Sequence, residues 1–200
     1  MNSYISAHNK AVLQNQKPEI KDCNCEDKSE CKFGGECRTP NVAYGVKVTV
    51  HSNGNGNASY FKKYWGSTGR EVKTRYSEHK NTYSQPPKKY HYAGIEHVRS
   101  EEQIAAEIEK KKKKSELAKF IWELKGAGLV EGKDFSIDWY IERSAVNYKN
   151  GHLFCDLCLT EATYILIGDP KTTLNKRQEV YHSCRYMPRF KLESFLNKPP

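Results

Sequence analysis

An arginine and a histidine four residues apart could form a phosphate site in the stretch Tyr64 to His79, which reads YWGSTGREVKTRYSEH. After its two glycines, the spacing predicts a helix on which Val72, Arg75, Tyr76 and His79 share one half-buried face. The planar fork of an arginine matches two phosphate oxygens, and an imidazole exchanges a proton near neutral pH. The pair is therefore suited to holding a phosphate. The alternative is a surface arginine beside a satisfied core histidine.

Four cysteines lie within the fifteen residues CNCEDKSECKFGGEC, a polar segment that can form no core of its own. A tetrahedral zinc site would order such a segment. The expected ligands are Cys23, Cys25, Cys31 and Cys37. Four protein ligands leave no position for water, so this zinc would be structural. Because the spacing CxCx5Cx5C is not a common zinc pattern, free or oxidisable thiols are the alternative.

A second set of metal-ligating residues lies toward the carboxyl end, namely Cys155, Cys158, His182 and Cys184. The CxxC pair is half of a zinc signature, and the later histidine and cysteine could complete it. Buried free cysteines are the alternative.

A carboxylate interrupts the apolar face of the helix predicted within CDLCLTEATYILIG. On that helix Glu161 falls between Cys158, Ala162, Ile165 and Leu166. Burial of an unpaired charge is costly, so Glu161 needs a partner, either a metal ion or a nearby arginine. A structural glutamate in a salt bridge is the alternative reading.

Three strands are expected to position these residues. Alternation from Tyr44 to Val50 predicts a half-buried strand, and a Gly/Asn loop leads to a second strand at Ser59 to Trp65. These two should form an antiparallel hairpin that brings Tyr44 close to Tyr64. The alternation from Phe135 to Ile141 predicts the third strand.

Further helices are expected between the second and third strands. Ser100 and Gln103 form a capping-box signature ahead of one helix, and Ser115 can cap the next. Five lysines separate them: Lys110, Lys111, Lys112, Lys113 and Lys114. Such a run is either a solvated turn or a contact for a phosphate backbone, which gives affinity without sequence choice.

The overall composition suits a polyanionic partner. The 200 residues contain 33 basic and 24 acidic side chains, for a net charge of +9, and 12% are aromatic. Nucleic acid is the default partner for such a chain, although solubility alone could explain the charge. No apolar run approaches the roughly 20 residues that span a bilayer, and MNSYISAHNK has no signal-peptide core. We therefore expect an intracellular protein without membrane contact.

Together these motifs resemble, in order, those of a GIY-YIG nuclease domain, with the endonuclease domain of Penelope-like retroelements as the nearest likeness. The resemblance rests on CRTPNVAYGVKV with the cysteines before it, YWGSTGREVKTRYSEHK, SELAKFIWELK, and CDLCLTEATYIL with LNKRQEVYHSCRY. It implies an α+β fold, in which helices flank a small three-stranded antiparallel sheet. A zinc-binding appendage would occupy residues 1–40 and the nuclease domain residues 41–195, with a lysine-rich insertion at about 91–114.

The resemblance also implies roles for six residues. Tyr44 and Tyr64 would be the signature tyrosines, with Tyr44 favoured as the general base or water-positioning group. Arg75 would steady the scissile phosphate and His79 would assist proton transfer or contact the phosphate. The remaining two are Glu161, which would hold Mg²⁺ or Mn²⁺, and Asn175, which would complete the pocket. The sequence departs from the pattern in VAY, which lacks a glycine, at Trp65, and in the insertion.

Two classes of function follow. The first is a metal-dependent endonuclease that nicks double-stranded DNA in the nucleus to prime reverse transcription. The 200 residues hold no reverse transcriptase, so that partner would act in cis or in trans, and the chain would be an excised domain or a stand-alone relative. A structure-selective repair nuclease of the same fold is a variant of this class. The second class is a non-catalytic, zinc-dependent nucleic-acid-binding module.

Overall fold

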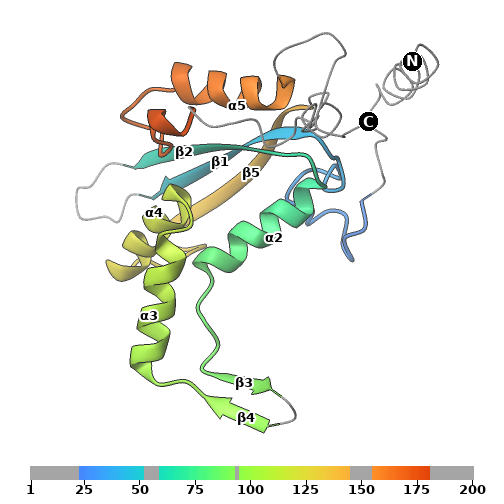
Figure 1. Ribbon diagram of the computed structural model, residues 1–200. Coiled ribbons are helices and arrows are strands. Elements are labelled where there is room, and N and C mark those ends of the chain that lie inside the picture. Colours follow the sequence, from blue (N-terminus) through green and yellow to red (C-terminus); the bar gives the residue numbers. More distant parts are fainter. Residues whose placement is uncertain (1–22, 52–58, 93–94, 145–154, 181–200) are drawn as a thin grey trace, which may run out of the picture.

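A three-stranded antiparallel sheet lies at the centre of the computed structural model, which describes residues 23–51, 59–92, 95–144 and 155–180 (Figure 1). Its strands are β1 (Val42–Val50), β2 (Tyr60–Thr68) and β5 (Phe135–Ser144), in the order β2-β1-β5. With four helices in the described residues, the chain is α+β. The expected fold class and its three-stranded sheet are therefore confirmed.

The second strand is longer than predicted. Gly66 was expected to break it, but β2 continues to Thr68 because Gly66 pairs with Tyr44 in the ladder with β1. A side chain at Gly66 would overlap the ring of Tyr44, so this glycine permits close packing within the sheet. The extension carries Ser67 to the end of the strand.

Helices lie on both faces of the sheet (Figure 1). On one face are α2 (Val72–Tyr83) and α4 (Glu116–Gly126), and on the other is α5 (Asp156–Ile167). The serine caps predicted for two helices are present: Ser115 accepts from the Ala118 N–H at the start of α4, and Ser100 forms the capping box of α3 (Glu101–Lys112). A short 3-10 helix, η1 (Arg177–Val180), follows α5.

The region predicted as an insertion forms α3 and most of a small hairpin. Strands β3 (Lys89–Tyr92) and β4 (Ile95–Val98) pair with each other and not with the central sheet. The hairpin and α3 project away from the sheet (Figure 1). The first three lysines of the block end α3, where cations interact favourably with the helix dipole, so that part of the block is helical.

The cysteine segment is part of the main core. Phe33 and Cys37 are buried in the same cluster as Val46, Leu117 and the other residues between the sheet and α2 and α4. The Phe33 ring meets the Tyr76 ring edge-on, with centroids 5.9 Å apart. In space, therefore, the segment expected to be an appendage packs with the domain that follows it.

Helix α5 was predicted correctly, but its buried face differs from the predicted one. Its buried residues are Leu157, Thr160 and Ile165, whereas Leu166 is 47% exposed. The helix is held in this rotation by Tyr164, whose ring stacks on Trp65 with centroids 4.8 Å apart. Glu161 consequently lies half-buried at the border of the apolar face. In the part of the chain that the structure describes, no helix is long and apolar enough to cross a membrane.

Candidate active site

A cavity of about 350 Å³ opens beside the carboxyl-terminal half of β2. Its walls come from β2, α2, the link between α3 and α4, α5 and η1, elements that are far apart in sequence. The lining residues are Tyr64, Gly66, Ser67, Arg75, Lys114, Ser115, Glu161, Gln178 and Glu179. Three of the six predicted site residues, Tyr64, Arg75 and Glu161, therefore line one cavity.

Arg75 is fixed by two neighbours. Its Nε donates to the Tyr44 hydroxyl oxygen over 3.1 Å, and its Nη1 donates to Glu78 over 3.1 Å. Burial alone would lower the pKa of the guanidinium, but the Tyr44 hydroxyl and Glu78 outweigh it and raise that pKa. The side chain remains 29% exposed. A fixed, permanently charged guanidinium thus faces the cavity.

His79 is not among the residues that line this cavity, but with Arg75 it lines a neighbouring hollow of about 530 Å³. Its Nε2 is 2.9 Å from the Tyr44 hydroxyl oxygen, and the residue is only 3% exposed. Burial, together with the positive charge of Arg75, lowers the pKa of His79 to about 3. Because Arg75 already donates to the Tyr44 oxygen, the Tyr44 proton is best directed at Nε2 of a neutral His79. A chain of hydrogen bonds thus runs from Arg75 through Tyr44 to His79.

The two tyrosines occupy different places. Tyr64 lines the cavity, and burial, with the nearby Tyr44, raises its pKa, so its hydroxyl stays protonated at neutral pH and can donate a hydrogen bond. Tyr44 is 1% exposed and lies under Gly66, where any Cβ would touch its hydroxyl. Gly66 itself lines the cavity. The missing side chain therefore brings the Tyr44 hydroxyl close to the cavity wall.

Glu161 reaches the cavity from the opposite face of the sheet to Arg75. Its carboxylate accepts a short hydrogen bond from the Ser67 hydroxyl at the end of β2. Among the described residues no arginine forms a salt bridge with Glu161. The side chain also lies at the border of the apolar face and not in its interior, contrary to the sequence expectation, because Tyr164 sets the rotation of α5. A hydroxyl orients a carboxylate without neutralising it, so the negative charge of Glu161 is retained for a cation.

Asn175 was expected to complete the pocket, but its hydrogen bonds give it a structural role. Its Oδ1 accepts from the Trp65 N–H over 2.7 Å, and its Nδ2 donates to the Trp65 carbonyl over 3.0 Å. The same Nδ2 donates to Glu179 over 3.1 Å. Asn175 is not among the residues that line the cavity. It therefore holds the backbone of β2 and orients a carboxylate that does line it.

Sequence reasoning missed Ser67, Gln178 and Glu179. Ser67 lay beyond the glycine at which the strand was expected to end, and the other two lie on a single 3-10 turn with no periodicity to identify it. The pattern YWGST gave one usable signal for Ser67, since alternation carried through Gly66 places it on the same face as Trp65.

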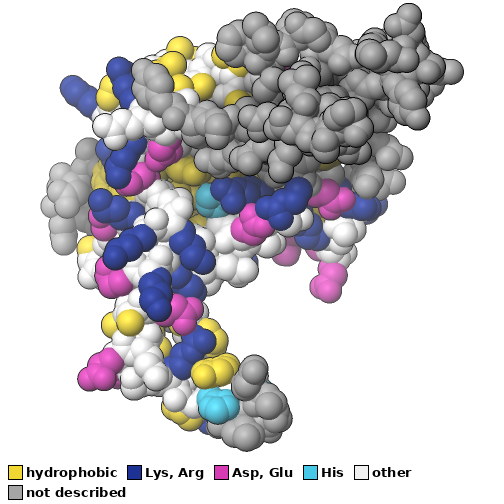
Figure 2. All heavy atoms as spheres, in the orientation of Figure 1, with side chains coloured by type: hydrophobic (Ala, Val, Ile, Leu, Met, Phe, Trp, Pro, Cys, Tyr) yellow, Lys and Arg dark blue, Asp and Glu magenta, His cyan; other side chains and the backbone are white. Residues whose placement is uncertain are grey.

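The lysine block is divided between structural and exposed positions. Lys111 donates to the Ser84 carbonyl over 2.9 Å, and Lys112 pairs with Glu109 at 2.5 Å. Lys114 lines the cavity, and with Lys113 it also lines a neighbouring hollow of about 650 Å³. Lys and Arg side chains are visible over α2, α3 and α4 on the face shown in Figure 2. The end of the block nearest Ser115 is thus the part that reaches the candidate site.

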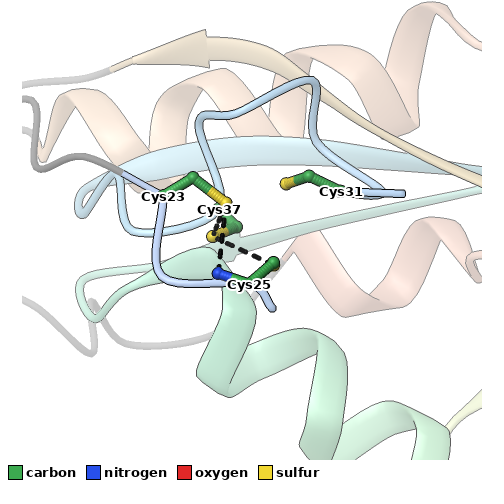
Figure 3. Close-up of side chains that lie close together, drawn as sticks. All are labelled: Cys23, Cys25, Cys31 and Cys37. Carbon is green, nitrogen blue, oxygen red and sulfur yellow. Dashed lines mark hydrogen bonds between the residues drawn. The ribbon is translucent and has the colours of Figure 1, made fainter. Parts of the chain in front are cut away.

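The four amino-terminal cysteines form a cluster that could hold a metal ion. Their sulfur atoms all lie within 4.8 Å of one another, with Sγ of Cys37 at 3.5 Å from that of Cys23 and 3.8 Å from that of Cys25. Zinc–sulfur bonds of about 2.3 Å in a tetrahedron place sulfurs about 3.8 Å apart. Figure 3 shows the four side chains turned toward one another. The thiols therefore fit a tetrahedral metal such as zinc.

The environment of the cluster differs between its members. Burial raises the pKa of Cys37 to about 12, and Cys23 adds to the effect. Burial also opposes ionisation of Cys31, but the backbone N–H groups of Phe33 and Gly35 outweigh it and lower the pKa to about 7. Lys73 of α2 lies 3.8 Å from the Cys25 sulfur. The hydrogen bond with Cys23 and burial raise the pKa of the Cys25 thiol, whereas a neighbouring cation acts in the opposite direction.

The cluster is also tied to the start of α2. The carbonyl of Cys37 accepts from the Lys73 N–H over 2.8 Å, and that of Thr39 accepts from the Val72 N–H over 3.1 Å. These are amides in the first turn, which no intrahelical carbonyl can satisfy. The cysteine segment therefore caps the helix that carries Arg75 and His79.

The second predicted metal set is described only in part. Cys155 and Cys158 lie at the start of α5 and pack with Leu157, with Cys155 buried. His182 and Cys184 lie outside the described residues. The predicted site thus stays a prediction.

Comparison of the chain with protein-family models, with curated proteins and with solved structures found no match.

Proposed function

We propose that this protein is a metal-dependent endonuclease that hydrolyses a phosphodiester bond of double-stranded DNA. One observation carries the proposal: a carboxylate and a fixed guanidinium reach the same open cavity from opposite faces of β2. Hydrolysis of a phosphodiester with a divalent cation requires both groups: the carboxylate to hold the cation, and the guanidinium to bind the phosphate oxygens. As part of this proposal, the chain has the GIY-YIG nuclease fold and is similar to the endonuclease domain of Penelope-like retroelements.

The chain's own residues would share the work as follows. Arg75, held by Tyr44 and Glu78, binds a non-bridging oxygen of the scissile phosphate without reorganising during the reaction. Tyr64, protonated at neutral pH, donates a hydrogen bond within the cavity. Lys114 contacts the phosphate backbone of the DNA next to the scissile bond.

Proton transfer would involve the chain from Arg75 to His79. The Tyr44 hydroxyl lies between the Arg75 guanidinium, whose positive charge would stabilise a tyrosinate, and the neutral His79 imidazole, which can accept its hydrogen bond. Because the pKa of His79 is lowered to about 3, the imidazole would orient the hydroxyl and not take up its proton at neutral pH. The place of Tyr44 under Gly66 brings its hydroxyl close to the cavity. There the protonated hydroxyl would orient the attacking water, or a tyrosinate formed by release of the Tyr44 proton to solvent would deprotonate that water.

Glu161 would hold the divalent cation, Mg²⁺ or Mn²⁺. The carboxylate is oriented by Ser67 and is an oxygen ligand of the kind that these ions prefer. When bound, the cation would act as a Lewis acid that stabilises the departing oxygen. The proposed biological setting is a nick in nuclear DNA, from which a reverse transcriptase in cis or in trans would extend.

The test is conversion of supercoiled plasmid to open circles by the purified chain with Mg²⁺ or Mn²⁺. Removal of a preorganised charge costs about 3 kcal/mol, so Arg75→Ala and Glu161→Gln should each slow nicking by about a hundredfold or more while plasmid binding persists. Arg70→Ala is the matched control, because Arg70 also pairs with Glu78 but is 62% exposed and does not line the cavity.

A second function is favoured by the cysteine cluster. Four sulfurs within 4.8 Å of one another and a basic surface would suffice for a zinc-dependent nucleic-acid-binding module. Wild-type protein that shifts plasmid in a gel but never nicks it, with either metal, would replace the nuclease proposal with this one.

A further inference from the structure

A small basic and aromatic surface lies on the central sheet outside the lining of the cavity. We call it the Phe61 surface, and it consists of Lys47 on β1 with Phe61 and Lys63 on β2. Alternation places Phe61 and Lys63 on the same face as Trp65 and Ser67, the face on which α5 packs. Trp65 is covered by Tyr164, whereas Phe61 is 37% exposed.

The two lysines of this surface are arranged unfavourably for stability alone. Lys47 and Lys63 are direct partners in the β1–β2 ladder, and like charges in that position repel. Asp138 faces Lys47 from β5, but no carboxylate among the described residues lies within salt-bridge distance of either lysine. Two neighbouring cations that form no salt bridge among the described residues could bind an anionic partner.

Both of these charges lie near the ring of Phe61. The Lys47 and Lys63 ammonium groups are 5.1 Å and 5.8 Å from the centroid of Phe61. A contact of this kind at an exposed site is weaker than the stacking of a nucleobase on an aromatic ring. A base could therefore displace an ammonium group from the ring, and that group could then move to a phosphate.

Bases in a duplex are stacked on one another and do not present a face to such a ring. Unpaired bases do, and aromatic side chains flanked by cations are the usual platform for single strands. The nearest residue of the cavity lining on β2 is Tyr64, three residues from Phe61 or about 10 Å at about 3.3 Å per residue. The surface therefore adjoins the cavity but shares no residue with its lining.

We propose that the Phe61 surface binds an unpaired nucleic-acid strand, with a base stacked on Phe61 and its phosphates on Lys47 and Lys63. The inference rests on the proposed nucleic-acid substrate but not on cleavage. The protein would then bind frayed, gapped or flapped DNA through an unpaired strand next to the bond that it cuts.

The test is the affinity of the full chain for a fluorescein-labelled oligothymidylate of about 12 nucleotides, by fluorescence anisotropy without divalent metal. The Phe61→Ala variant lacks the ring on which a base would stack, so its affinity for the oligothymidylate should be about tenfold lower than that of the wild type. The Phe61→Trp variant should bind with the wild-type affinity. Tyr60→Ala is the matched control, because Tyr60 is the adjacent aromatic, is 46% exposed and points to the other face of β2.

The lysines provide a second measurement. Lys47→Gln should reduce the slope of log K against log salt by about 0.7, the value for one contact with a single strand. Its melting temperature should be unchanged or higher, since one of two repelling charges is gone. A lower melting temperature with an unchanged slope would show that the lysine is structural and would overturn the inference.

Other outcomes are equally decisive. Equal loss of affinity in Phe61→Ala for a duplex and for the oligothymidylate would make the surface a duplex contact and refute strand selectivity. Wild-type protein that nicks plasmid while Phe61→Ala binds the oligothymidylate normally would refute this inference alone. Wild-type protein that binds neither plasmid nor oligothymidylate would refute the proposed function as well.

Discussion

His79 should make the free energy of unfolding depend on pH between pH 7 and pH 5. The imidazole is 3% exposed, and burial with the charge of Arg75 lowers its pKa from 6.5 to about 3. Tyr44 and Tyr64 face it from the sheet, and Arg75 and Glu78 lie on its own helix. The folded protein therefore keeps His79 neutral at pH values where the unfolded chain protonates it.

The sign and size follow from linkage. Between the two pKa values the unfolded state binds one proton more, so stability falls as pH falls. The loss approaches about 1.4 kcal/mol per pH unit below pH 6.5 and sums to about 2 kcal/mol between pH 7 and pH 5. Although burial opposes it, hydrogen bonds from Arg70 and Arg75 lower the pKa of Glu78, so that carboxylate titrates below this window.

The assay is urea unfolding followed by tryptophan fluorescence at pH 7 and at pH 5, for wild type and His79→Gln. Glutamine can still bond to the Tyr44 hydroxyl but does not titrate, so subtraction of the two proteins removes the contribution of every other group. Wild type should lose about 2 kcal/mol more than the variant. Parallel losses in the two proteins would refute the buried, neutral histidine.

Three further predictions concern the same core. Gly66→Ala should lower stability by about 1–3 kcal/mol and nicking more steeply than stability, because the new methyl displaces Tyr44; melting and plasmid assays would check this. Asn175→Ala should cost about 2 kcal/mol in urea unfolding, since the buried Trp65 amide loses its partner. A zinc chelator should release one metal ion per chain and lower the melting temperature, and Cys37→Ser should abolish that response.

The sheet and most helix starts could be predicted because their signals are local. Alternation identified the three strands, and serine caps located the beginnings of α3 and α4 within a residue. The face of α5 could not be predicted in the same way. Its apolar residues are spread around the helix, so its rotation depends on the stacking of Tyr164 on Trp65, a contact made across nearly a hundred residues.

In the candidate site, too, residues with a local sequence signal could be predicted and residues that depend on long-range contacts could not. Arg75 and Glu161 were singled out because a charged residue on the face of a predicted helix carries a pattern in sequence, although the setting predicted for Glu161 was wrong. Tyr64 was singled out by the family resemblance. The structural role of Asn175 could not be predicted, because an amide that bonds to the backbone of Trp65 leaves no periodic signal. Only the three-dimensional structure shows that it holds β2 and orients Glu179.

The cysteine cluster and the cavity are also linked in a way that their separation in sequence conceals. Carbonyls of Cys37 and Thr39 hold the first amides of α2, and Arg75 lies one turn further along that helix. Frayed helix ends gain order when their amides are satisfied. Loss of metal from the thiols should therefore loosen the first turn of α2 and with it the guanidinium in the cavity. A structural metal in this position would support catalysis without contacting the substrate.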